Sequence, residues 1–320
     1  MVHVLMPVLI AALLPLSHTV AAQSAPPPLA LVLGTATPGG GFPVYGEAFV
    51  AAVREADPAL VIEPRNTKGS MENIPLLEAG KLDIALVQGE LAYEALAGQG
   101  RAPSGLKVIT AMYSTAGMFV MRADSPVRTI EDLRGKQVAL GAKGSGLTVL
   151  GRLVLQGLGL DPDRDIEPVY LDRAGDGPAM VLDGRVAALW GGGIGWPGFT
   201  ALAEAPGGAR FVAPSEDGIA RILARNPSMR RLTVPAGAYK GQDAPIASVG
   251  SWSLVLARPD LDEASGYRLA RALDRGKAAL GRRLPAARET DPANTVAAVP
   301  PGWLHPGVRR YLGEAGHLRP

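Results

Sequence analysis

The stretch that decides the fold is LVLGTATPGGGFPVYG, residues 31–46. It begins with a short apolar run, typical of a strand that enters a buried sheet, and continues through a glycine-rich loop. Apolar residues then recur at helical spacing from Phe42 to Ala56. A strand, a glycine loop and a helix start present backbone N–H groups at the positive end of a helix dipole. The stretch therefore predicts a loop that binds an anion or a polar ligand.

The same arrangement recurs later in the chain. A strand at 137–140 leads into GAKGSG, residues 141–146, which opens a second helix. A polar loop at 67–73 lies beside the first glycine loop, and Ser70 or Asn73 is expected to cap the helix after it. Because a glycine loop occurs in each half of the chain, we expect the two loops to face each other across a cleft.

The order of elements predicts an α/β fold. Strands at 31–33, 60–62, 82–87 and 107–113 alternate with helices, as in a parallel sheet, and a second unit begins at 118. The alternating run at 246–257 is expected to return the chain to the first domain. Two crossings, near 114–119 and 240–250, would interleave two α/β domains around a two-segment hinge, which is a clamshell built for closure. The expected limits are 30–115 plus 248–320 for domain 1 and 116–247 for domain 2.

The N-terminus indicates export. An apolar run at 6–16, followed by small residues up to Ala22, is typical of a signal peptide. We expect residues 1–22 to be removed and 23–29 to form a flexible leader of a periplasmic protein. No other stretch approaches the roughly 18 apolar residues that a membrane span needs, so we expect the mature protein not to span a membrane.

Composition and missing motifs exclude several function classes. The 320 residues carry a net charge of +2 and only 5% aromatic residues, which argues against nucleic-acid binding. The absence of cysteine excludes a thiolate metal site and a cysteine nucleophile. His305 and His317 form a poor metal pair and leave no histidine base near the glycine loops. No serine lies in G-x-S-x-G, neither glycine loop gives G-x-G-x-x-G, and the loop at 141–146 lacks the ending of a P-loop. The prediction is binding without catalysis, metal or cofactor.

Several motifs together resemble the TAXI family of TRAP-transporter solute receptors. They are G-T-x-x-x-G-G at 34–40, T-x-G-S-x-x-N at 67–73, AGKLDIALVQ at 79–88 and GAKGSG at 141–146. The resemblance covers nearly all of the chain after the signal peptide. It implies a type II periplasmic binding protein that delivers a small organic acid to TRAP membrane permease subunits, and we expect a monomer.

The resemblance also implies a set of ligand-binding residues, to which Gly193 is added from the glycine-rich segment 190–196. The set is Thr35, Gly39, Gly40, Gly41, Phe42, Thr67, Gly69, Ser70, Asn73, Gln88, Tyr113, Gly144, Ser145, Gly146 and Gly193.

The chain departs from the family pattern where ligand contacts are expected. Gly41 and Phe42 stand where relatives often carry Thr-Tyr, and Leu147 stands where a threonine is common. These changes remove hydroxyl groups and add apolar bulk. We therefore expect a ligand less polar than glutamate, such as a monocarboxylate or an aromatic or branched acid. Two alternatives stay open: a periplasmic ligand-sensing protein that partners a signalling receptor and, less favoured, an enzyme on the same fold.

Overall fold

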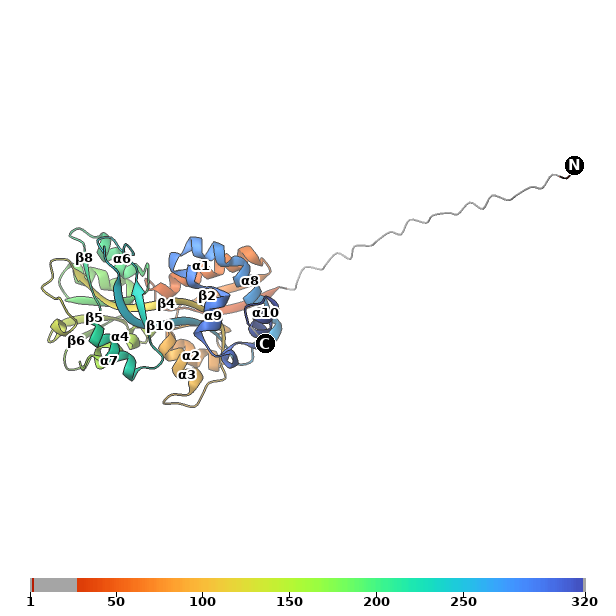
Figure 1. Cartoon of the computed structure of the whole chain (residues 1–320), viewed down its shortest axis with the longest axis horizontal. Helices are drawn as coiled ribbons and strands as arrows, with labels where there is room; N and C mark the ends of the chain where they lie inside the picture. The colour runs from red at the N-terminus through yellow and green to blue at the C-terminus, as the bar shows by residue number, and fades with distance from the viewer. Residues whose placement is uncertain (1, 3–27, 319–320) are drawn as a thin grey trace.

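The chain folds into two α/β halves that share one ten-stranded sheet (Figure 1). The computed structural model describes residue 2 and residues 28–318. The predicted signal peptide, residues 1–22, and the leader up to residue 27 lie outside the described residues, apart from residue 2. In the described part of the chain, no helix combines the length and the apolar character needed to cross a membrane.

The first half alternates strands and helices from the opening stretch onward. Its strands β1, β2 and β3 pair in parallel. All four residues of β3 are buried, as expected of a parallel strand covered on both faces. The elements are β1 (Leu29–Gly34), α1 (Gly41–Ala56), β2 (Leu60–Arg65), α2 (Ser70–Glu78), β3 (Ile84–Val87) and α3 (Gly89–Ala97).

The second half repeats this pattern. Strands β5, β6 and β7 are parallel, and the hydroxyl of Ser145 caps helix α4 by accepting a hydrogen bond from the Leu147 N–H. The elements are β5 (Gln137–Ala142), α4 (Gly146–Gly157), β6 (Glu167–Leu171), α5 (Gly177–Leu182), β7 (Ala188–Gly192), α6 (Pro197–Glu204), β8 (Ala209–Val212), α7 (Glu216–Arg225) and β9 (Arg230–Val234).

Two long strands, β4 (Lys107–Arg122) and β10 (Ile246–Ala257), carry the chain between the halves, as Figure 1 shows. They pair antiparallel with each other in the middle of the sheet. One end of β4 continues along β7 and β8, whereas β10 pairs with β9 at one end and β3 at the other. Each strand therefore belongs to both halves. The prediction of two interleaved α/β domains joined by a two-segment hinge is confirmed.

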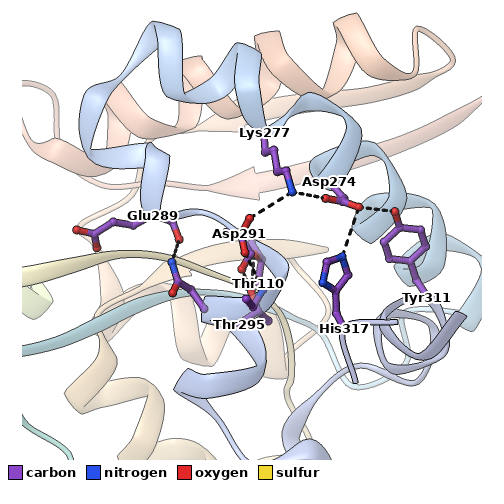
Figure 2. A network of polar contacts seen from close by, with 10 residues as sticks. Thr110, Asp274, Lys277, Glu289, Asp291, Thr295, Tyr311 and His317 are labelled. Atoms are coloured by element: carbon purple, nitrogen blue, oxygen red, sulfur yellow. Dashed lines mark hydrogen bonds and ion pairs between the residues drawn. The ribbon is translucent and has the colours of Figure 1, made fainter. Parts of the chain in front are cut away.

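The C-terminal segment packs against the first half and holds the crossing strand β4 (Figure 2). The Lys277 ammonium lies 3.0 Å from the Asp274 carboxylate and 3.3 Å from that of Asp291. The Ser114 N–H of β4 donates to the Glu289 carboxylate at 2.7 Å, which fixes β4 close to its crossing point. The helices of this segment are α8 (Glu263–Arg283), α9 (Pro292–Ala298) and α10 (Pro306–Glu314).

The hydrophobic core also divides into two parts. One buried cluster draws its residues from 31–113 and 254–312, and two smaller clusters draw theirs from 116–249. The large aromatic side chains Phe49 and Phe119 lie fully buried in the first and second part, respectively. Each half therefore has its own core. The exact domain limits, 30–115 plus 248–320 and 116–247, remain a prediction.

Two local predictions are wrong. The sequence separates a strand at 107–113 from a unit starting at 118, but β4 is continuous because Thr115 and Ala116 keep pairing with β10. Neither Ser70 nor Asn73 caps helix α2, whose N-cap residue is Gly69 with a φ of 106°. The Ser70 hydroxyl accepts a hydrogen bond from the Gln88 N–H instead.

Candidate functional site

Five helix N-termini converge on one cavity between the halves. Helices α1, α2 and α4 begin at Gly41, Ser70 and Gly146, and all three residues line the cavity. Helices α3 and α6 begin directly after Gln88 and Trp196, which also line it. The first N–H groups of a helix have no partner within the helix and carry partial positive charge. The cavity is therefore surrounded by positive dipole ends from both halves.

The lining is neutral and mixes hydroxyl, amide and apolar groups. None of its residues is Lys, Arg, His, Asp or Glu. About 60 Å³ of the cavity is open to the centres of water-sized molecules. A single water needs roughly 10–15 Å³ on this measure, so the cavity suits a small ligand. Its lining residues are Ala36, Thr37, Gly40, Gly41, Phe42, Gly69, Ser70, Gln88, Tyr113, Thr115, Gly141, Ala142, Ser145, Gly146, Leu147, Ala174, Gly192 and Trp196.

The structure brings nine of the fifteen predicted site residues to this cavity. Both glycine loops are represented, so the predicted placement of the two loops across one cleft agrees with the geometry. Contact between these residues and a ligand remains a prediction. The nine residues are Gly40, Gly41, Phe42, Gly69, Ser70, Gln88, Tyr113, Ser145 and Gly146.

Three predicted polar residues lie behind the cavity wall. Asn73 is fully buried, and its side-chain amide donates to the carbonyls of Thr35 and Leu86 at 2.8 Å each. The Thr67 hydroxyl donates to the same Thr35 carbonyl at 3.1 Å. These side chains are engaged by the backbone of the first glycine loop. Asn73, Thr35 and Thr67 therefore position the loop and do not line the cavity.

Three predicted glycines also lie outside the lining, although two of them join the halves. An added Cβ at Gly39 would lie 2.5 Å from the Gly175 Cα of the opposite half. The Gly144 carbonyl accepts a hydrogen bond from the Met71 N–H of the first half at 3.2 Å. Gly193, with a φ of 88°, accepts a hydrogen bond from the Tyr239 hydroxyl. Backbone thus meets backbone around the cavity.

Gln88 is the most informative side chain of the lining. It is 2% exposed, and its oxygen accepts a hydrogen bond from the Ser253 hydroxyl at 3.3 Å. Its amide nitrogen forms no hydrogen bond of regular geometry among the described residues, although the side chain lies close enough to the buried Glu90 carboxyl to offset part of the rise in that group's pKa. A ligand acceptor at this position would therefore offer the amide donor a better-aligned partner.

Aromatic side chains form one wall of the cavity. Burial raises the pKa of Tyr113 well above its ordinary value, and the neighbouring Tyr45 adds to the rise, so the hydroxyl stays protonated at neutral pH. An added Cβ at Gly41 would lie 3.2 Å from both the Tyr113 hydroxyl and the Trp196 ring. The Trp196 ring packs edge-on against Phe199, with 5.0 Å between ring centroids. Apolar ring surface and a hydroxyl donor therefore meet at Gly41.

The site prediction missed several lining residues. Thr115 lies two residues after Tyr113 on the same strand, so the alternation of β-strand side chains was a usable signal for it. Trp196 ends the glycine-rich segment 190–196 and lines the cavity, whereas Trp190, at the start of that segment, is fully buried in the core. Gly192 lies in the same segment, next to the predicted Gly193, whereas Ala174 belongs to no motif and only the folded chain brings it to the cavity.

The fold is that of a type II periplasmic binding protein, because the structure resembles solved structures with this fold. The periplasmic aliphatic sulphonate binding protein SsuA from Escherichia coli is 22% identical, with 92% of this chain and 84% of that chain covered and a TM-score of 0.50. A protein described as a periplasmic transporter is 16% identical, with coverage of 81% and 87% and a TM-score of 0.54. OxyR from Corynebacterium glutamicum, bound to hydrogen peroxide, is 14% identical, with coverage of 81% and 66% and a TM-score of 0.51.

A family model narrows the assignment. The model of the NMT1-like family matches residues 33–316, which include both glycine loops and both crossing strands. The chain belongs to the NMT1-like family.

Proposed function

We propose that the protein is an extracytoplasmic solute receptor. It binds a small organic anion, a carboxylate, in the cavity between the halves and delivers it to a TRAP-type secondary transporter. The observation that carries the binding step is the convergence of five helix N-termini on a small, neutral cavity. Helix N-termini bind anions through their free N–H groups and their dipole.

The lining favours a ligand with one carboxylate and an apolar body. The carboxylate would be held by backbone N–H groups, the hydroxyls of Ser70 and Tyr113 and the amide nitrogen of Gln88. Phe42, Leu147 and Trp196 would contact the rest of the ligand. A second carboxylate, as in glutamate, would find no cationic side chain in this lining. We therefore propose a monocarboxylate or an aromatic or branched acid.

We propose that the receptor works by binding and hinge closure, not by catalysis. A general base or nucleophile has to lie within reach of the substrate, and this lining contains none of the usual His, Asp, Glu, Lys or Cys side chains. The signal-like N-terminus supports a periplasmic location, and the TAXI-like motifs support a TRAP permease as the partner of a monomeric receptor.

The first experiment is a thermal-shift screen of organic acids, followed by calorimetry. A ligand that binds only the folded state raises the melting temperature by mass action. We expect branched or aromatic monocarboxylates to raise it more than glutamate does. Tight binding of glutamate without binding of such acids would contradict the proposed ligand class, and a screen without any shift would argue against the receptor function.

Gln88→Met tests the site itself. The change keeps the side-chain length and removes the amide donor, so affinity for the best acid should fall by roughly tenfold or more while the fold persists. Gln156→Met, at an exposed position of α4, is the matched control and should leave affinity unchanged. Equal affinity of the Gln88 variant and the wild type would refute the assignment of Gln88.

A transport assay separates the receptor from the sensing alternative. Membrane vesicles with a TRAP permease, supplied from the gene neighbourhood of this protein, should accumulate the acid only when the receptor is added. If the gene neighbourhood supplies a sensor kinase instead, and ligand changes the kinase activity, the sensing function is the better assignment.

A further inference from the structure

A second cavity lies close to the crossing strands and is larger than the first. About 250 Å³ of it is open to the centres of water-sized molecules, compared with about 60 Å³ in the first cavity. Arg230 contributes to it from the second half, and Tyr93, Trp252 and Trp303 contribute from the first half. Gly89, which follows the first-cavity residue Gln88, also lines it. The two cavities therefore approach each other across the start of helix α3.

Arg230 places a positive charge at the rim of this second cavity. It is the exposed first residue of β9, and its Nη1 donates to the carbonyls of Pro227 and Met229 at 2.7 and 2.8 Å. These bonds leave most of the five N–H donors of the guanidinium without an acceptor among the described residues. Within residues 28–318 no carboxylate forms an ion pair with Arg230, whereas its neighbour Arg231 is paired with Glu216 at 2.6 Å.

Ser251 places a hydroxyl in the same cavity. The residue is 5% exposed and lines the cavity from β10. Its hydroxyl forms no hydrogen bond of regular geometry among the described residues, although it lies close enough to the Glu90 carboxyl to offset part of the rise in that group's pKa. A ligand acceptor would therefore offer this hydroxyl a better-aligned partner. Burial raises the pKa of the nearby Glu90 carboxyl, which favours its uncharged form and limits repulsion of an anion.

Aromatic rings supply an apolar wall beside these polar groups. Tyr93 packs edge-on against Trp303, with 5.4 Å between ring centroids, and Trp252 lies half-buried on β10. Such walls bind flat or branched apolar bodies, and a few polar groups then orient the ligand.

We infer that this second cavity is a separate ligand site for a small organic anion with an aromatic or branched apolar body. Arg230 pairs with the anionic group, the Ser251 hydroxyl hydrogen-bonds to the ligand, and Trp252 and Trp303 hold its apolar part. The assignment does not depend on the proposed function, because it uses none of the residues that line the first cavity.

Tryptophan fluorescence tests this assignment with benzoate as the probe. Trp252 and Trp303 report on the second cavity, and Trp196 reports on the first. The fourth tryptophan, Trp190, is fully buried in the core and lines neither cavity. In a Trp196→Phe background, we expect benzoate to quench the remaining fluorescence in a saturable way. The neutral benzamide should bind at least tenfold more weakly, because the charge-assisted contact with Arg230 is lost.

Two arginine variants decide the outcome. Arg230→Gln in the same background should raise the Kd for benzoate by roughly tenfold to a hundredfold. Arg231→Gln, one residue further along, should leave the Kd unchanged, and both changes lie at exposed positions that a folded chain tolerates. The inference is overturned by a lack of saturable quenching, by equal effects of the two variants, or by equal affinity for benzoate and benzamide.

Discussion

Replacing Gly146 with alanine should prevent the two halves from closing over the cavity. Gly146 is the first residue of α4 in the second half. An added Cβ would lie 2.3 Å from the Gln88 Cβ and 2.6 Å from the Ser70 hydroxyl, both in the first half. Ordinary contact begins at 3.4 Å, so the halves would have to separate by at least 3.4 − 2.3 = 1.1 Å at this point.

The size of the effect follows from what this separation breaks. The hydrogen bond between the Met71 N–H and the Gly144 carbonyl is 3.2 Å long, and a further 1.1 Å takes it beyond hydrogen-bonding range. One such bond is worth about 0.5–1.5 kcal/mol, and a ligand held from both sides loses contacts as well. We therefore expect the affinity to fall by roughly tenfold or more, which corresponds to about 1.4 kcal/mol. The φ of Gly146 lies outside the left-handed region, so alanine adds no backbone strain to the second half.

Calorimetry with the acid that gives the largest thermal shift measures this loss. Gly313→Ala in α10 is the matched control, because none of the described residues lies within 4 Å of the Cβ that it would add. It should keep wild-type affinity. Small-angle scattering of the Gly146 variant should show a more open molecule in the presence of the acid. Wild-type affinity of Gly146→Ala would refute the closure argument.

Three further substitutions test other parts of the account. Glu90→Gln should stabilise the protein relative to wild type as the pH rises above 4.5, by up to about 1.4 kcal/mol per pH unit. Burial raises the folded-state pKa of Glu90, so the wild type loses stability when this carboxyl has to become charged, and glutamine avoids that loss. Asn73→Ala should lower the free energy of unfolding by roughly 1–3 kcal/mol, since it removes the amide donor of the Leu86 carbonyl and leaves the Thr35 carbonyl with the Thr67 hydroxyl. Asp57→Asn should lower the free energy of unfolding by about 1.5–3 kcal/mol at pH 7, because Asp57 forms a two-pronged ion pair with Arg268 that lowers the Asp57 pKa. This difference from wild type should vanish as the pH falls from 3.8 through the lowered folded-state pKa.

Denaturant unfolding at several pH values measures all three. A constant difference between Glu90→Gln and wild type from pH 4 to 8 would contradict the raised pKa. A loss below about 1 kcal/mol for Asn73→Ala would contradict its role in holding the glycine loop. For Asp57→Asn, a difference that persists below the folded-state pKa would argue against the ion pair as its source.

The sequence predicted those features that depend on local patterns. The strand, glycine loop and helix starts at 31–46 and 137–146 need only near neighbours in the chain, and the structure places both loops at one cavity. The alternating run at 246–257 likewise indicated a long strand that returns the chain to the first half, and β10 is that strand.

Features that depend on distant contacts were harder to predict. Ser70 has the residue type of a helix cap, but its hydroxyl accepts a hydrogen bond from the Gln88 N–H, which tertiary folding brings close. Asn73 and Thr67 belong to a ligand-like motif, yet the Thr35 carbonyl engages both side chains. Packing between distant segments decides which residues of a motif line a cavity and which residues support its wall. The spacing of residues along the chain does not show this packing.

We propose that the cavity between the halves binds a small organic anion through helix N-termini and neutral donors. The most direct test is calorimetric titration with the acid selected by the thermal-shift screen and with its uncharged amide. We expect saturable binding of the acid at one site, which Gln88→Met weakens, and binding of the amide at least about tenfold weaker. Equal binding of acid and amide, or acid binding that Gln88→Met leaves unchanged, would contradict it.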